Sequence, residues 1–183
     1  MKNLFFLALA LATALYTSSC ETDDLPNDSS TTCDNLPHTQ APAGLTGSWA
    51  NGFTSFTQIV DAYDGRFLGT TWSSGKYFKF TAAGTRAEFY FMAKSQFSTT
   101  ATRAEGSVAF DEGSTAESGS FVFYACSAHY KGWGSVTVDR PATQDELANN
   151  LSRRYYYRRE GEWLRIDPSG TPNDYSSSFR KLD

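Results

Sequence analysis

The sequence predicts an all-β protein, an antiparallel up-and-down barrel of about eight or nine strands with one short helix, and two observations support this prediction. The first is the alternation of aromatic and other residues in Lys76–Lys94, where Phe78 and Phe80 share one face of a strand and Phe89 and Phe91 share one face of the next. Such alternation indicates a half-buried antiparallel hairpin. The second is the recurrence of similar short strands, separated by polar turns, along the chain. A β-sandwich is the alternative fold for this pattern.

The remaining strands are short segments between turn residues. In chain order they are a strand entered at Trp49, then Phe53–Val60, Arg66–Trp72, Arg103–Phe110, Gly119–Ala125, Ser135–Asp139, Arg153–Arg159 and Glu162–Asp167. The alternation aligns Phe121 with Phe123 on one face of a strand. It also places Phe110 on the same face as Val108, two residues before it. The segment His129–Gly134 is predicted to be an aromatic loop, and Pro168–Asp183 a polar tail.

One segment, residues 143–151, carries helix signals. Thr143 followed three residues later by Glu146 fits a capping box, in which each side chain bonds the backbone N–H of the other residue. Leu147 and Leu151 are four residues apart and form a narrow apolar stripe that can pack on the barrel.

The first 19 residues have the organisation of a secretory signal peptide. Lys2 is followed by the apolar run Leu4–Leu15, which is too short for a lasting transmembrane helix, and then by small polar residues. Cys20 comes next, an arrangement that resembles the lipobox of bacterial lipoproteins, and the run Glu21–Asp24 is similar to lipoprotein surface-export signals. The resemblance implies a lipid anchor on Cys20 in the outer membrane of the cell envelope. An ordinary signal peptide is the alternative.

Residues 20–44 are predicted to be a flexible tether, because Asp, Asn, Ser, Thr and Pro dominate them, and residues 45–183 a single barrel domain. With Cys20 lipidated, Cys33 and Cys126 remain in an oxidising compartment, and a disulfide is their natural pairing. Such a bond would join the end of the tether to the barrel wall. Two free thiols are the alternative.

The composition limits the classes of partner and of chemistry. Removing the leader takes away one basic residue and leaves 15 Lys and Arg against 20 Asp and Glu, without a basic block. This balance argues against a nucleic acid partner, and the size suits a monomer with one core. The two histidines, His38 and His129, lack ligand spacing to a cysteine and lie beside no evident nucleophile. No catalytic residue, metal or cofactor is therefore predicted, and the chain is not expected to be an enzyme.

Three features resemble bacterial lipocalin-like lipoproteins: the entry Gly47-Ser48-Trp49, the successive hairpins, and the late hairpin from Tyr155 to Leu164. The resemblance covers most of residues 45–167 and implies an eight-stranded barrel with a ligand cavity, without defining the ligand. The Thr-Asp-Trp and arginine signatures of typical lipocalins are absent. The predicted helix also precedes the last hairpin, whereas a lipocalin helix follows the barrel.

The inward face of the predicted barrel is the candidate binding site. Its aromatic members are Phe78, Phe80, Phe89, Phe91, Phe110, Phe121, Phe123, Tyr155 and Tyr157. In one interpretation these rings line a cavity for a small hydrophobic or aromatic ligand, with Tyr155, Tyr157 and Arg153 at its mouth. In the other they form a solid core, and the protein acts through its loops as a surface interaction or inhibitor protein.

Overall fold

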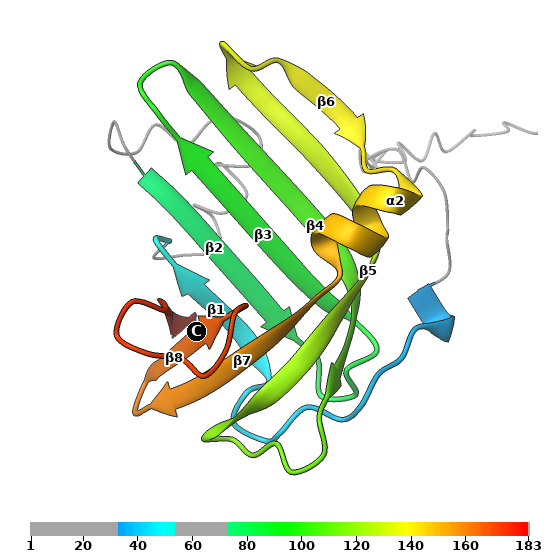
Figure 1. Ribbon diagram of the computed structural model, residues 1–183, viewed down its shortest axis with the longest axis vertical. Helices are drawn as coiled ribbons and strands as arrows, with labels where there is room; N and C mark the ends of the chain where they lie inside the picture. The colour runs from blue at the N-terminus through cyan, green and yellow to red at the C-terminus, as the bar shows by residue number, and fades with distance from the viewer. Residues whose placement is uncertain (1–32, 54–72, 183) are drawn as a thin grey trace, which may run out of the picture. The chain divides into compact units, whose positions relative to one another are not determined.

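The computed structural model describes residues 33–53 and 73–182, in which nine strands form one antiparallel sheet (Figure 1). After the short helix η1 (Cys33–Asn35), the strands are β1 (Gly47–Asn51), β2 (Ser73–Phe80), β3 (Ala87–Lys94), β4 (Ser98–Phe110), β5 (Ser118–Gly134), β6 (Val138–Pro141), β7 (Arg153–Glu160), β8 (Trp163–Asp167) and β9 (Ser177–Leu182). Their order in the sheet is β4-β3-β2-β1-β9-β8-β7-β5-β6, and β4 also pairs with β5. That additional pairing closes eight strands into a barrel and leaves β6 on the outside, so the predicted fold class is confirmed.

The hairpin predicted over residues 76–94 is present as β2 and β3. Phe78 pairs with Phe89 and Lys76 pairs with Phe91 in its register. Because side chains alternate across a strand, these four residues lie on the same face of the sheet. Phe78 belongs to the main core cluster, with Phe89 packed against it, so this face points into the barrel.

Strand β5 is longer than the sequence suggests. The predicted aromatic loop His129–Gly134 is wrong, because these residues continue the 17-residue strand. They pair with β4 on one side, and His129–Gly132 also pair with β6 on the other. Ladder hydrogen bonds on two sides offset the weak strand preference of the glycines in this stretch. The predicted strand Ser135–Asp139 is correspondingly displaced, since β6 is Val138–Pro141.

Strand β9 was not predicted. It lies in the segment expected to be a polar tail, and it pairs with β1 on one edge and with β8 on the other. Phe179 in this strand is fully buried, whereas Tyr175 just before it is 99% exposed. The tail prediction is therefore wrong for Ser177–Leu182, because two unpaired strand edges are satisfied only when this segment joins them.

The predicted helix is present over eight residues, as α2 (Gln144–Glu146) continued by the wider π-turn η2 (Leu147–Leu151), between β6 and β7 (Figure 1). Its capping box is formed: Glu146 N donates to Thr143 Oγ1 at 3.3 Å, and Thr143 N donates to Glu146 Oε2 at 2.8 Å. Leu147 is buried in the main core, so the expected apolar stripe faces the barrel.

Several predictions fall outside the described residues. These are the leader, Cys20, the first part of the tether, and the predicted strands Phe53–Val60 and Arg66–Trp72 apart from Phe53 itself. Within residues 33–53 and 73–182, no helix has the length and apolar character needed to cross a membrane.

Candidate functional site

One end of the barrel is covered by the segment between η1 and β1. Thr39 N donates to Val108 O at 3.1 Å, and Ala41 N donates to Ala82 O in the β2–β3 turn at 2.9 Å. Ala41 and Leu45 are buried and belong to the main core cluster. This covering segment, residues 33–45, therefore closes that end, which we call the closed end (Figure 1).

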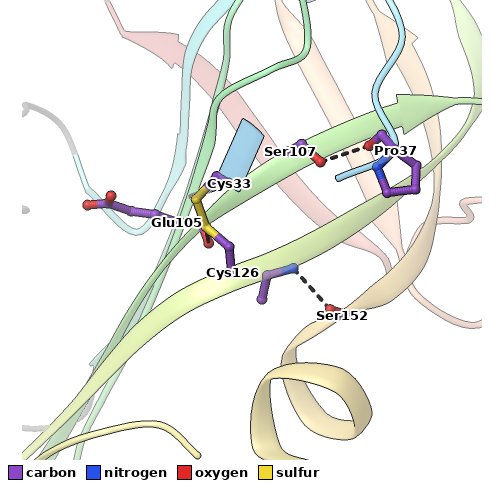
Figure 2. The surroundings of a disulfide bond; sticks show 7 residues. Cys33, Pro37, Glu105, Ser107, Cys126 and Ser152 are labelled. Atoms are coloured by element: carbon purple, nitrogen blue, oxygen red, sulfur yellow. Dashed lines mark hydrogen bonds between the residues drawn. A yellow bond between two sulfur atoms is a disulfide. The ribbon is translucent and has the colours of Figure 1, made fainter. Parts of the chain in front are cut away.

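A disulfide between Cys33 and Cys126 holds the covering segment on the barrel wall (Figure 2). The bond joins residues 93 positions apart, with their Cα atoms 5.6 Å from one another, and it confirms the predicted pairing. Ser107 Oγ also donates to Pro37 O at 2.8 Å beside the bond. The far end of the predicted tether is thus tied to β4 and β5.

Trp49 lies in the closed end and is fully buried. Its indole Nε1 donates to Leu45 O at 2.8 Å. The Arg159 guanidinium lies 6.0 Å from the ring centroid and the Lys181 ammonium 5.7 Å from it, both within cation–π range. These two contacts are not evident from the sequence, because the basic residues come from β7 and β9, far from Trp49 in the chain.

The structure divides the nine predicted aromatic residues into two groups. Five of them belong to the packed core: Phe80, Phe110, Phe121, Phe123 and Tyr157, each at most 7% exposed. The ring centroid of Phe121 lies 5.2 Å from that of Phe80 and 5.4 Å from that of Phe110, the separation of aromatic pairs in protein cores. Tyr157 donates its hydroxyl to Thr115 O at 2.5 Å, and burial raises the pKa of this phenol to about 12. Tyr157 is therefore a core residue and not part of a mouth.

The other four, Phe78, Phe89, Phe91 and Tyr155, line a cavity of about 240 Å³ in the opposite half of the barrel. Phe78 is its floor, with ring centroids 4.8 Å from Phe89 and 5.2 Å from Tyr155. The remaining lining residues are Lys76, Thr102, Asn150, Leu151, Arg153, Ile166, Pro168, Ser177 and Phe179. We call this cavity the cup.

Polar groups of the cup come from five elements. Lys76 on β2 donates from Nζ to Ser177 Oγ on β9 at 2.8 Å, Thr102 comes from β4, and Asn150 comes from the helical segment. Arg153 comes from β7, where its charge lowers the pKa of Tyr155 against a larger upward shift caused by burial. An apolar floor with a few polar groups is the usual make-up of a small-molecule site.

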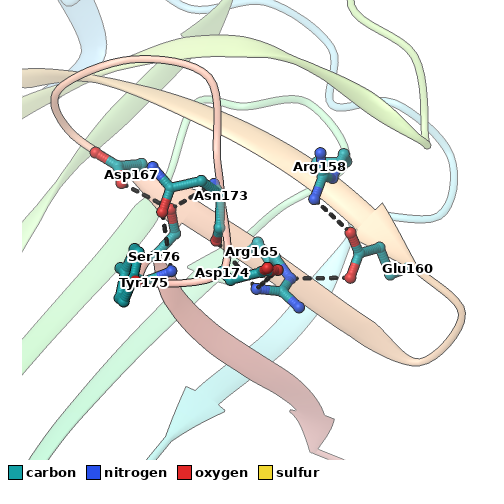
Figure 3. Close-up of polar contacts among 8 residues, drawn as sticks. All are labelled: Arg158, Glu160, Arg165, Asp167, Asn173, Asp174, Tyr175 and Ser176. Carbon is teal, nitrogen blue, oxygen red and sulfur yellow. Dashed lines mark hydrogen bonds and ion pairs between the residues drawn. The ribbon is translucent and has the colours of Figure 1, made fainter.

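The loop between β8 and β9 is held in place beside the cup by its own polar contacts (Figure 3). Ser176 Oγ donates to Asp167 Oδ2 at 2.7 Å, and Arg165 donates to Asn173 O at 3.0 Å. Arg165 also pairs with Glu160 at 2.9 Å. These contacts fix the position of Pro168, a wall residue of the cup.

Three lining residues, Lys76, Leu151 and Phe179, are not among the predicted site residues. A signal for Lys76 was present, because it lies two residues before Phe78 and therefore shares its face. The spacing of Leu151 from Leu147 indicates a packing stripe, and Phe179 lies in β9, for which the sequence shows no strand pattern.

The remaining candidate for chemistry, His129, is not among the residues that line the cup. Its Nε2 lies 2.5 Å from Asp139 Oδ1 in a pair with both side chains exposed to solvent. Among the described ranges 33–53 and 73–182, no group of three or more His, Cys, Asp or Glu side chains could hold a metal ion.

Comparison with known proteins leaves the site to be interpreted from its geometry. No protein-family model matches the chain, and no curated protein matches its sequence. The resemblance of the Gly47-Ser48-Trp49 entry and of the last hairpin to lipocalin-like lipoproteins is thus an interpretation of the sequence.

Proposed function

We propose that this protein binds a small hydrophobic or aromatic ligand in the cup. The observation that carries the proposal is a cavity of about 240 Å³ lined by the rings of Phe78, Phe89 and Phe91, beside core residues such as Phe80 and Phe121 that are 1% exposed. This is the volume that about eight water molecules occupy in liquid water, and it leaves room for a ligand of about ten non-hydrogen atoms. Pockets for drug-sized ligands start at about 300 Å³, so the expected ligand is smaller than a typical drug molecule.

Binding follows from the surfaces that the cup offers. An apolar ligand gains about 25 cal/mol for each Å² of apolar surface that it removes from water, and aromatic walls supply that surface from several sides. The strands that carry these walls belong to a closed sheet, so the site is largely formed before the ligand arrives.

We propose no catalytic activity for this cup. Acid–base or nucleophilic catalysis needs a base within hydrogen-bond reach of the reacting group, and His129 with Asp139 does not line the cavity. The polar groups that do, among them Thr102, Asn150 and Ser177, suit the orientation of a ligand better than its conversion.

Two-dimensional NMR with neutral probes tests the binding proposal. Octanamide and indole should shift amide resonances of cup residues at high micromolar to millimolar concentration. Phe91→Trp fills the cup and should weaken binding at least about tenfold, since lost apolar contact of about 1.4 kcal/mol changes affinity by that factor. Val136→Trp is the matched control, because Val136 is 43% exposed and outside the cup. Absence of binding by both probes, or equal loss in both variants, would refute the proposal.

We also propose that the protein is a lipoprotein of the cell envelope, anchored through Cys20 in the outer membrane. The formed disulfide supports an oxidising compartment. Mass spectrometry of the mature N-terminal peptide should find a lipid-modified Cys20, and Cys20→Ala should release the protein from the membrane fraction. An unmodified Cys20 in the membrane-bound protein would contradict the anchor.

A further inference from the structure

The cup carries positive charge on a wall that is otherwise apolar. Lys76 lies on the inward face of β2, in the same row as Phe78 and opposite Phe91 in the register. A lysine in such a position lays its aliphatic stem along apolar side chains and keeps its ammonium at the polar margin. The ammonium is found there, at the hydroxyl of Ser177.

Lys76 has hydrogen-bonding capacity left over. Its ammonium has three N–H donors, of which the contact with Ser177 Oγ at 2.8 Å uses one. It forms no ion pair with any residue in the described ranges 33–53 and 73–182. Two donors are therefore available to a group inside the cup.

The carboxylate of Asp167 lies close enough to Lys76 for the lysine charge to act on it, and this carboxylate already has hydrogen-bond partners of its own. It accepts from Ser169 N at 2.8 Å and from Ser176 Oγ at 2.7 Å (Figure 3 draws the Ser176 contact). These bonds, rather than Lys76, account for most of its lowered pKa, and the charge of Lys76 is the weakest of the causes. Asp167 therefore does not neutralise the ammonium by direct contact.

A second cation lies elsewhere on the rim. Arg153 begins β7 and shares its face with Tyr155, two residues on, and both line the cup. Like Lys76, Arg153 forms no ion pair within the part of the chain that the structure describes. Thr102 and Asn150 add uncharged hydrogen-bonding groups. No Asp or Glu is among the lining residues, so Lys76 and Arg153 give the described wall of the cup a positive charge.

We propose that the ligand of the cup is a small monocarboxylate, with its aliphatic or aromatic body among Phe78, Phe89 and Phe91 and its carboxylate at Lys76 and Ser177. This inference rests on the proposed binding function and adds the charge of the ligand to it. A hydrogen bond between an ammonium and a carboxylate is about twice as strong as one between neutral groups, and the neighbouring rings reduce its screening by water. Arg153 attracts the same anion from the rim, as a more exposed charge.

Octanoate and octanamide test the proposal, because they have the same length and shape and differ in charge. Calorimetric titration at neutral pH and low salt should show octanoate binding about tenfold or more tightly than octanamide. Lys76→Met keeps an unbranched apolar side chain and removes its charge, so it should abolish the preference for octanoate over octanamide. The matched control is Lys79→Met, since Lys79 lies on the outer face of the same strand and pairs with Glu88 at 3.1 Å.

The outcomes separate the two proposals. If the unaltered protein binds both probes with equal affinity, the proposed preference for a carboxylate is wrong, and the binding function is retained. If it binds neither probe, the binding function itself is wrong. An octanoate preference that survives Lys76→Met would overturn the role of Lys76. If Lys76→Met does not fold, Lys76→Gln and the salt dependence of the preference give the same decision, because only a charge-based preference decreases as salt increases.

Discussion

The two halves of the barrel interior have the same kind of side chain and different packing. Phe80 near the closed end and Phe78 in the cup lie two residues apart on one face of β2, and both are 1% exposed. Phe80 packs against Phe110 and Phe121, whereas Phe78, which also packs against Phe121, is a lining residue of the cup. The difference comes from the covering segment, which adds Ala41 and Leu45 to the core at one end only. Alternation along a strand thus determines on which face of the sheet a ring lies. The covering segment determines whether that ring is part of the packed core or lines the cup.

The basic residues of the two halves differ in a related way. At the closed end, Arg159 and Lys181 lie over the buried ring of Trp49. In the cup, Lys76 and Arg153 line a cavity and form no ion pair in the described ranges. A cation held on a buried ring strengthens the fold, and a cation on the wall of a cavity can bind a ligand.

The largest expected effect concerns the cover of the closed end. Cys33→Ser combined with Cys126→Ser should reduce the free energy of unfolding by roughly 4–5 kcal/mol, since the bond closes a long loop in the unfolded chain. Urea denaturation monitored by tryptophan fluorescence measures this change. Dithiothreitol should destabilise the unaltered protein and leave the double variant unchanged. An unaltered denaturation midpoint in the double variant would show that the bond does not hold the covering segment.

The second effect compares one ring from each half. Phe121→Ala should lower the free energy of unfolding by about 3–4 kcal/mol, because Phe121 is 1% exposed and a cavity remains in its place. Phe91→Ala should lower it by about 1 kcal/mol, because Phe91 is partly exposed and already borders a space. Chemical denaturation of the two variants side by side gives the difference. Equal losses would mean that both halves are packed alike and that the cup is closed in solution.

The smallest effect is a pH dependence of the helical segment, which supplies Asn150 and Leu151 to the cup. The Arg140 guanidinium and the Thr143 backbone N–H lower the pKa of Glu146 to about 2 from its ordinary 4.5. A carboxylate with a lowered pKa in the folded state stabilises that state above its ordinary pKa. The stabilisation should therefore be complete above about pH 4.5 and disappear as the pH falls toward 2.

Hydrogen exchange of the 144–152 amides between pH 5 and 2, corrected for intrinsic exchange rates, measures this loss. Glu146→Gln should remove the pH-dependent step, and Glu112→Gln, in an exposed loop, should retain it. Protection that stays constant over this range in the unaltered protein would exclude a contribution from the Glu146 contacts.

Much of the fold was predictable because its signals are local. The hairpin 76–94, the capping box at Thr143 and the last hairpin each show within a few residues, and all three are present. Strand β9 and the second half of β5 were not predictable in the same way. Their residues alternate weakly, and they become strands because β1, β8, β4 and β6 provide edges on both sides.

The sequence by itself indicated which aromatic residues of the predicted strands share a face, because the two-residue period of a strand is a property of the backbone. It also indicated Cys33 and Cys126 as the expected disulfide, which the structure contains. Only the tertiary structure decided that Phe121 is core, that Phe91 is lining and that Lys76 reaches the hydroxyl of Ser177. The physical reason is that packing density depends on segments that are distant in the chain, here the covering segment at one end and β9 and the helical segment around the cup.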